Sequence, residues 1–324
     1  MNIAGLDLGE RPLFLAPMED VTDASFRYIC KEYGADMVYT EFVSADGLIR
    51  DAAKTLDKMR FDPSERPIGI QIYGHIPSAL LEAAQRAAQA KPDVVDINFG
   101  CPKSKIAQRG AGSGWLRDPD ALVEMTRQLV QAIPLPVTVK TRLGWDDDAI
   151  IIEELAERLQ DVGIAALSIH GRTKMQMYKG SANWEPIAAV KRNPRIHIPI
   201  IGNGDIATPQ AAKEAFEKFG VDGVMIGRAT FGYPWLFRDI RHYLNTGELL
   251  PPMSVTERVA LSRKHLAKSI EIKGPRVGVL EMRRHLSCYF KGLTDFKSTR
   301  LKLVTENDPE ALFRLLDYIE ERWG

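Results

Sequence analysis

The clearest candidate for chemistry in this chain is the thiol of Cys101, which ends the segment Asp96-Ile97-Asn98-Phe99-Gly100-Cys101-Pro102. The segment begins as a buried strand and stops at a Gly/Pro break, so an amide and a thiol follow the strand. Barrels of alternating strands and helices carry their reactive groups at this end of each strand. The residues leave two roles open: a nucleophile activated by a base such as His170, or a proton donor, since a thiol with a pKa near ~8.5 is protonated at neutral pH.

The elements that must position this segment follow a regular alternation. Short β-branched runs alternate with amphipathic helical stretches over the first three quarters of the chain, which predicts an α/β (β/α)8 TIM barrel. A doubly wound sheet is the alternative, but it rarely uses eight uninterrupted repeats. The predicted strands are 13–16, 37–40, 68–72, 94–97, 137–140, 166–169, 198–201 and 223–226, and the clearest helices between them are 78–90, 119–132, 148–162 and 209–219.

The last quarter of the chain has a different pattern. After Pro251-Pro252 the apolar period becomes helical and no strand pattern remains. Helices are predicted over 255–272, 277–292 and 309–323. We therefore expect a catalytic barrel over residues 1–250 and a small C-terminal helical domain over residues 251–324.

Polar residues follow the other predicted strands and indicate a cofactor. Gly202-Asn203-Gly204-Asp205 follows strand seven and Gly227-Arg228 follows strand eight, where barrels commonly bind phosphate. Lys140 and His170 end two neighbouring strands and are placed to face the polar edge of a flavin ring. Gln71 is placed to reach the same ring from across the barrel. Each feature alone has a plain structural explanation, so the prediction depends on the set.

Composition restricts the class of protein. The 45% hydrophobic and 27% charged residues are ordinary for a globular protein, and three widely spaced cysteines suggest neither disulfides nor a zinc site. We expect no leader peptide, no membrane span and no metal. The cysteine usage predicts a reduced, cytoplasmic protein, and we expect a monomer. The net charge is zero, but residues 258–302 hold 12 basic and 3 acidic residues, a balance of +9. That stretch predicts a polyanionic partner.

Several motifs, in order along nearly the whole chain, resemble the tRNA-dihydrouridine synthase family, and most closely its bacterial B branch. They are Ala16-Pro17-Met18 with Thr22-Asp23 and Phe26-Arg27, the Cys101 segment with Lys105, Val139-Lys140-Thr141-Arg142, Ile169-His170-Gly171-Arg172-Thr173, the two glycine segments above, and Arg283-Arg284-His285 with Tyr289 and Lys291-Gly292. Two departures stand out. Glu19-Asp20 brings carboxylates near the expected flavin, and Ser113-Gly114-Trp115 replaces smaller residues, where we expect Trp115 to pack the loop.

The resemblance implies an FMN enzyme that reduces the C5–C6 double bond of uridines in tRNA with NADPH or NADH. It makes Cys101 the proton donor and Asn98 the residue that orients the uracil, with Lys105, Arg172, Arg283 and Arg284 as further substrate contacts. The residues that it implies for FMN are Pro17, Met18, Gln71, Lys140, His170, Asn203, Gly204, Asp205, Gly227 and Arg228. The alternatives are a flavin reductase of a free pyrimidine or another small unsaturated substrate, and a tRNA-binding protein without chemistry.

Overall fold

The computed structural model describes all 324 residues and has an eight-stranded parallel barrel at its centre. The strands run in the order β3-β11-β10-β9-β8-β7-β6-β4, and a parallel bridge between Phe14 and Met37 brings the two end strands together. All eight predicted strands are confirmed. The barrel strands are β3 (Leu13–Leu15), β4 (Val38–Tyr39), β6 (Ile68–Tyr73), β7 (Val94–Asn98), β8 (Val137–Arg142), β9 (Ala166–His170), β10 (Ile200–Asn203) and β11 (Gly223–Ile226).

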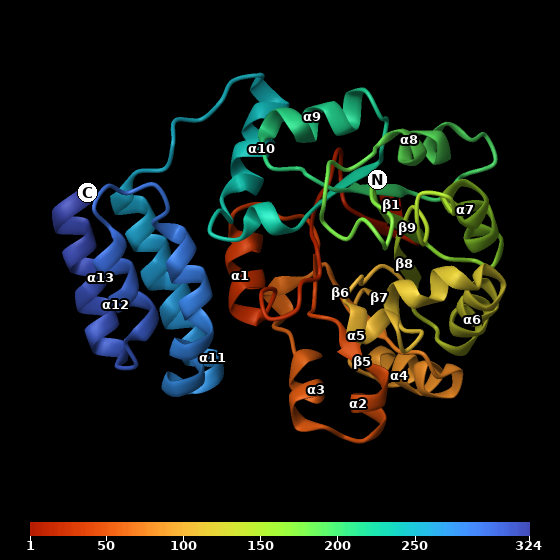
Figure 1. Ribbon diagram of the computed structural model, residues 1–324, viewed down its shortest axis with the longest axis horizontal. Helices are drawn as coiled ribbons and strands as arrows, with labels where there is room; N and C mark the ends of the chain where they lie inside the picture. Colours follow the sequence, from red (N-terminus) through yellow and green to blue (C-terminus); the bar gives the residue numbers. More distant parts are fainter.

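Helices surround the barrel, as Figure 1 shows. The longer ones bury an apolar face against the outward side chains of the strands, and these contacts form the largest hydrophobic cluster of the protein. The helices of this part of the chain are α1 (Ala24–Glu32), α2 (Ala45–Ile49), α3 (Ala53–Lys58), α4 (Pro77–Gln89), α5 (Ser104–Ala107), α6 (Pro119–Ala132), α7 (Ile152–Asp161), α8 (Glu185–Arg192), α9 (Pro209–Glu217) and α10 (Leu236–Thr246).

Local sequence explains where several of these helices begin. The hydroxyl of Thr208 accepts a hydrogen bond from the backbone N–H of Ala211 at 3.2 Å, and Pro209 occupies the first turn of α9. Asp118 caps α6 in the same way. Helix α7 begins at Ile152 and not at residue 148 as predicted, because Gly144 and Ile150 form an antiparallel bridge just before it.

The inside of the barrel changes from apolar to polar along the strands. Towards the N-terminal ends of the strands it is filled by side chains such as Phe14, Val94 and Ala166. Gln71, Asp96 and Thr138 come next and lie side by side in register on three neighbouring strands. The barrel core therefore has a polar layer directly beneath the ends of the strands.

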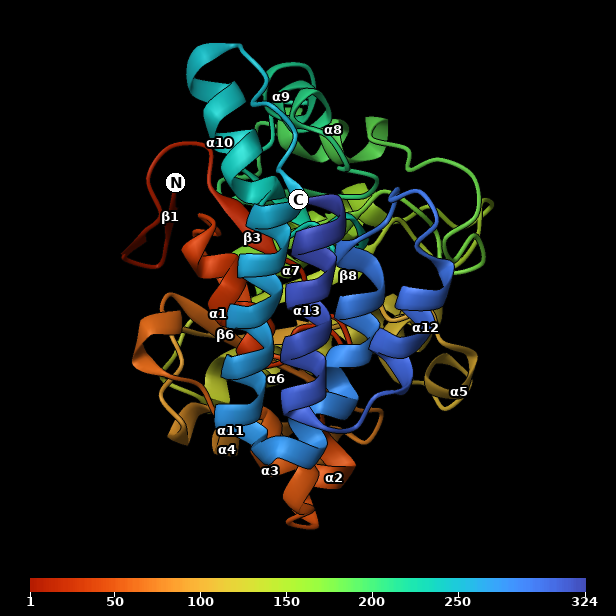
Figure 2. The same ribbon diagram turned by 90° about the vertical axis from the view of Figure 1, so that its left-hand side faces the viewer.

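The C-terminal helical region packs beside the barrel, and Figures 1 and 2 show its helices standing next to α1. It consists of α11 (Val255–Tyr289), α12 (Lys297–Thr305) and α13 (Pro309–Trp323) and has its own hydrophobic cluster. The two helices predicted over 255–292 form one element interrupted at Gly274, whose φ of +77° departs from helical geometry just before Pro275. The sequence prediction gave no range for seven of the helices, α1, α2, α3, α5, α8, α10 and α12, or for three short strands, β1 (Asn2–Ile3), β2 (Leu6–Asp7) and β5 (Val43–Ser44).

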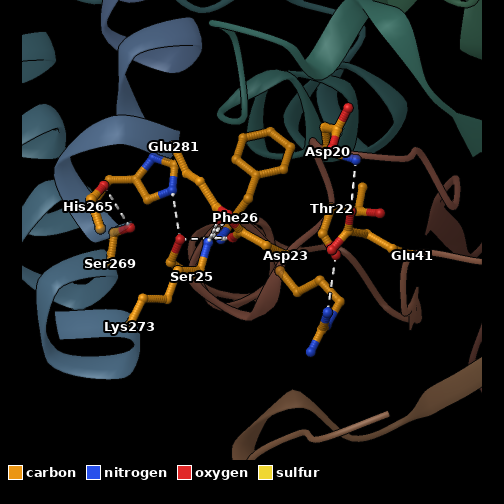
Figure 3. Close-up of polar contacts among 12 residues, drawn as sticks. Asp20, Thr22, Asp23, Ser25, Phe26, Glu41, His265, Ser269, Lys273 and Glu281 are labelled. Atoms are coloured by element: carbon orange, nitrogen blue, oxygen red, sulfur yellow. Dashed lines mark hydrogen bonds and ion pairs between the residues drawn. The ribbon is translucent and has the colours of Figure 1, made fainter. Parts of the chain in front are cut away.

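Polar contacts join α11 to the start of α1, and Figure 3 labels Asp23 and Ser25 on one side and His265, Lys273 and Glu281 on the other. Lys273 pairs with Asp23, the N-cap residue of α1, and with Glu281 on α11. The ring of His265 lies 3.2 Å from the hydroxyl of Ser25 and 2.8 Å from the hydroxyl of Tyr289. The helical region is thus connected to the helix that directly follows the Pro17–Met18 loop.

No helix in the structure is both long enough and apolar enough to cross a membrane.

Candidate active site at the mouth of the barrel

A cavity of about 610 Å³ opens where the barrel strands end. Its volume is within the range of ~300–1,000 Å³ that small-molecule sites occupy. Most of the predicted site residues line this cavity, although they come from widely separated parts of the chain. They are Pro17, Met18, Asn98, Cys101, Lys140, His170, Asn203, Gly204, Asp205, Gly227 and Arg228.

The loop that carries Cys101 is held by hydrogen bonds to its backbone. The side-chain oxygen of Asn98 accepts from the N–H groups of Gly100 at 3.0 Å and Cys101 at 2.8 Å. The Ser113 hydroxyl donates to the Cys101 carbonyl at 2.8 Å. Burial raises the pKa of the Cys101 thiol above its usual range, although nearby cations oppose the shift. The thiol is therefore protonated at neutral pH.

Lys140 is a cation without a carboxylate partner. Its Nζ donates to the side-chain oxygen of Asn203 at 3.1 Å, and Asn203 donates in turn to the Met225 carbonyl at 2.8 Å. No acidic side chain lies within ion-pair distance of Lys140. Burial, together with the charge of Arg142, lowers the pKa of Lys140 to about 8. A cation placed in this way at a cavity wall is suited to an electron-rich or anionic ligand.

His170 lies on the neighbouring strand and is neutral. Burial and the surrounding cations, Arg142 first among them, lower its pKa well below the ordinary histidine range. Its Nε2 lies 3.4 Å from a guanidinium nitrogen of Arg172. Because a guanidinium can only donate, Nε2 acts as acceptor and the ring proton is on Nδ1. His170 is thus a neutral hydrogen-bond donor and not a cation.

The turns after β10 and β11 leave the backbone open to a ligand. Gly204 has a φ of +135°, and a Cβ there would lie 2.7 Å from the Cβ of Ala182. Only glycine fits this position, which keeps the turn narrow. Arg228 has a side chain that is 55% exposed and pairs with Asp205 at 3.1 Å. These features fit the phosphate of a cofactor at the end of β10 and β11.

Two of the predicted residues are buried close to the cavity but do not line it. Gln71 is fully buried beneath it, where its amide contacts Asp96 and Asn98. Arg172 is 1% exposed and forms a bidentate ion pair with Asp205 at 2.9 and 2.6 Å. It also donates to the carbonyls of Lys179 and Gly180. The structure therefore gives the Arg172 guanidinium a place beneath the loop after β9.

The three remaining candidates lie outside the cavity. Lys105 is exposed on α5. Arg283 donates to two backbone carbonyls at the C-terminal end of α12, at 3.1 and 3.2 Å, and to the side chain of Asn307 at 2.8 Å. Arg284 is 44% exposed and donates to the Asp20 carbonyl, so it connects the helical region to the barrel. Of the two arginines, Arg284 presents more of its charge to solvent.

Arg142 and Tyr178 are among the cavity-lining side chains that the sequence prediction missed. Arg142 is 2% exposed and donates to the Gly100 carbonyl at 2.7 Å and to two carbonyls of the loop after β9. Its pKa falls to about 10 because of burial. Tyr178 lies in that loop, with its ring 4.7 Å from the Arg228 guanidinium carbon. Arg142 lies at the same strand end as Lys140, and this position could have identified it as a site residue. No feature of the sequence identified Tyr178.

The two sequence departures also have places in the structure. The indole N–H of Trp115 donates to the Gly74 carbonyl at 2.8 Å, and its ring packs edge-on against Phe99. This agrees with the packing role expected for Trp115. Glu19 lines the cavity and pairs with Lys58, which also lies 3.7 Å from Glu41. Of the Glu19-Asp20 pair, Glu19 therefore faces the cavity, and Lys58 is its ion-pair partner.

Comparison with known proteins identifies the family of this chain. The family model described as "Dihydrouridine synthase (Dus)" matches residues 14–318. The chain belongs to the dihydrouridine synthase family. It is 39% identical to tRNA-dihydrouridine synthase B of Pseudomonas aeruginosa, over 92% of this chain and 90% of that protein. It is 41% identical to the probable tRNA-dihydrouridine synthase 1 of Synechocystis sp., over 98% and 88%, and 39% identical to tRNA-dihydrouridine synthase B of Proteus vulgaris, over 95% of each.

The resemblance to this family, and to its bacterial B-type members, is therefore confirmed. The chain is a flavoprotein oxidoreductase, and its activity is the reduction of uridines in tRNA. Both alternatives, a reductase of small substrates and a tRNA-binding protein without chemistry, are set aside.

Proposed function

We propose that this dihydrouridine synthase binds FMN in the 610 Å³ cavity and is reduced by NADPH or NADH. The observation that carries the proposal is Lys140, a cation beside the cavity with no acidic partner. The neutral Nδ1–H of His170 and the amide of Asn203 add polar contacts for a ring. The turns at Gly204–Asp205 and Gly227–Arg228 would hold the phosphate, and Pro17 and Met18 would cover the ring from the β3 side.

Cys101 is the proton donor in this proposal. FMN held in the cavity and reduced by NADPH or NADH would supply the hydride for C6 of the uracil. Cys101 releases its proton from Sγ to C5, so that the two hydrogens saturate the double bond and the thiolate is left behind. The raised pKa of the thiol supports this role, because the donor is protonated before reaction. Asn98 lies three residues before Cys101 and orients the uracil once the base has left the helical stack.

The tRNA would contact exposed cations on the side of the molecule that carries α5 and α12, which Figure 2 shows on its right. Lys103, Lys105 and Arg109 lie around α5, and none has an acidic partner within ion-pair distance. The same is true of Lys297, Arg300 and Lys302 on α12. Cations with no partner in the protein are free to pair with phosphates. We propose residues 251–324 as the tRNA-binding domain, with Arg283 and Arg284 as contacts, and a cytoplasmic monomer as the working form.

The identity of the flavin is tested by the purified protein. We expect a yellow protein, and heat-released cofactor that runs with FMN and not with FAD on chromatography. The protein with Lys140→Met should bind FMN at least about tenfold more weakly, since it loses a charged hydrogen-bond donor. A colourless protein that FMN does not reconstitute would rule the proposal out.

A further inference from the structure

Asp96 is a buried carboxylate that the proposed reaction does not use. It points into the barrel from the middle of β7, is 1% exposed and has no cation within ion-pair distance. Its two oxygens each accept one hydrogen bond of 2.6 Å, from the amide of Gln71 and the hydroxyl of Thr138. Burial raises its pKa to about 6, despite both donors. A carboxylate in such a place is costly, so its presence needs a reason.

A chain of hydrogen bonds connects Asp96 to the Cys101 loop. The Gln71 Nε2 donates to Asp96 Oδ2, and the Gln71 Oε1 accepts from the Asn98 Nδ2 at 2.8 Å. The Asn98 Oδ1 then accepts from the backbone N–H groups of Gly100 and Cys101. Three side chains on two neighbouring strands thus connect a buried carboxylate to the backbone of the proposed acid.

The groups at the two ends of this series of hydrogen bonds require the same donor-to-acceptor direction along it. The Oδ2 of Asp96 accepts in either protonation state, because a proton on Oδ1 can be donated to Thr138. Backbone N–H groups can only donate. Both amides between these ends therefore have one orientation that satisfies every group, and a reversed Gln71 would set two N–H donors against each other.

We propose that Asp96 is a positioning residue for proton transfer: through Gln71 it fixes the Asn98 amide, and through Asn98 the backbone at Cys101. The inference rests on the proposed function, in which Cys101 donates the proton and Asn98 faces the base. Removing the acceptor leaves the Gln71 N–H group buried without a partner, and the side chain must move to satisfy it. A small displacement of a reacting group lowers a rate by factors of about 10–100.

The test compares two substitutions at Asp96 with a matched one at Thr138. Asp96→Asn keeps an acceptor for Gln71 and should retain at least about a third of the parental rate of flavin reoxidation by tRNA. Asp96→Leu removes the acceptor and should lower that rate by about tenfold or more. Its flavin reduction by NADPH and its KM for tRNA should change less than about twofold. Thr138→Val breaks the other Asp96 hydrogen bond in the same layer and should keep the parental rate within about threefold.

A second measurement needs neither flavin nor tRNA. Cys30 and Cys288 are buried, so a thiol reagent added to the flavin-free protein reports mainly on Cys101. Asp96→Leu should raise the rate of Cys101 alkylation by iodoacetamide several-fold, because the loop is less firmly held, while Asp96→Asn should not. If the leucine variant does not fold, Asp96→Ser is used in its place. Serine is smaller, and its side chain is too short to provide the acceptor for Gln71.

The possible results distinguish a failure of this inference from a failure of the proposed function. In an Asn98→Ala background, Asp96→Leu should cause no further loss, because the connection is already broken. A full additional loss there, or an equal loss in Thr138→Val, would overturn the positioning role. A parent protein that binds flavin but never forms dihydrouridine would refute the proposed function, and the alkylation rates would still decide whether Asp96 positions Cys101.

Discussion

Protonation states divide the polar residues of the cavity into two kinds. Cys101 and His170 are neutral at pH 7, because burial raises the pKa of the thiol and lowers that of the imidazole. Lys140 and Arg142 carry charge beside them, although burial lowers the pKa values of both, to about 8 and about 10. The cavity therefore offers a proton donor next to fixed positive charge, which suits a step that delivers hydride and proton to the same double bond.

The pKa of Lys140 predicts how FMN affinity depends on pH. The lysine is charged below about pH 8 and neutral above it, and we expect FMN to bind the charged form. Affinity should fall above about pH 8, by up to about tenfold per pH unit, as the lysine loses its proton. Quenching of FMN fluorescence measures this. Lys140→Arg should move the fall to higher pH, and an unchanged pH profile in that variant would exclude Lys140 as the titrating group.

The contact between α1 and α11 connects the helical region to the segment before α1, which lines the cavity. Burial alone would raise the pKa of Asp23, but Lys273, His285 and His265 lower it well below the usual carboxylate range. The ion pair therefore stabilises the fold above the unfolded-state pKa of about 3.9, and that stabilisation is lost as the pH falls through the lower folded-state value.

Asp23→Asn tests this contact, because asparagine can still cap α1. We expect a loss of about 2 kcal/mol in the free energy of unfolding at pH 7, since Lys273 loses one of its two partners. The loss should shrink below about pH 4, where the parent carboxylate also becomes neutral in the unfolded state. The control is Asp118→Asn, at the exposed cap of α6, which has no ion pair. Equal losses in the two variants, measured by urea unfolding, would show that Asp23 acts as a cap alone.

The elements that are predicted best from the sequence are those whose apolar residues repeat with a clear period. All eight strands and the main helices between them follow from β-branched runs and amphipathic stretches. Helix α12 was missed because its apolar residues do not form one face: Leu301 is 62% exposed and Leu303 is fully buried. Most cavity residues could be predicted because strand ends share one face of a barrel. The Gln71–Asp96 contact could not, because it depends on the register between β6 and β7.

At the scale of the whole molecule, charge is distributed unevenly. Many cations on the barrel helices have acidic partners, such as Arg158 with Asp120 and Lys191 with Asp222. The exposed cations near α5 and on α12 have none. A zero net charge therefore coexists with a surface that can attract a polyanion from one side.

Charge reversal tests this surface. Lys105→Glu combined with Arg300→Glu should raise the Kd for tRNA by about tenfold or more and reduce the slope of log K against log salt by about 2. The control is Arg192→Glu on α8, where the arginine is 65% exposed and lies near Glu185. It should leave both the Kd and the slope unchanged. Equal salt slopes in the double variant and the parent would place the tRNA elsewhere.

The central claim is that Cys101 protonates a uridine beside a flavin held at the mouth of the barrel. A single-turnover experiment tests it most directly, with NADPH-reduced Cys101→Ala protein and tRNA that lacks dihydrouridine. We predict normal flavin content and normal reduction by NADPH, but dihydrouridine formation slower than in the parent by about 100-fold or more. Formation of dihydrouridine at the parental rate would contradict the claim.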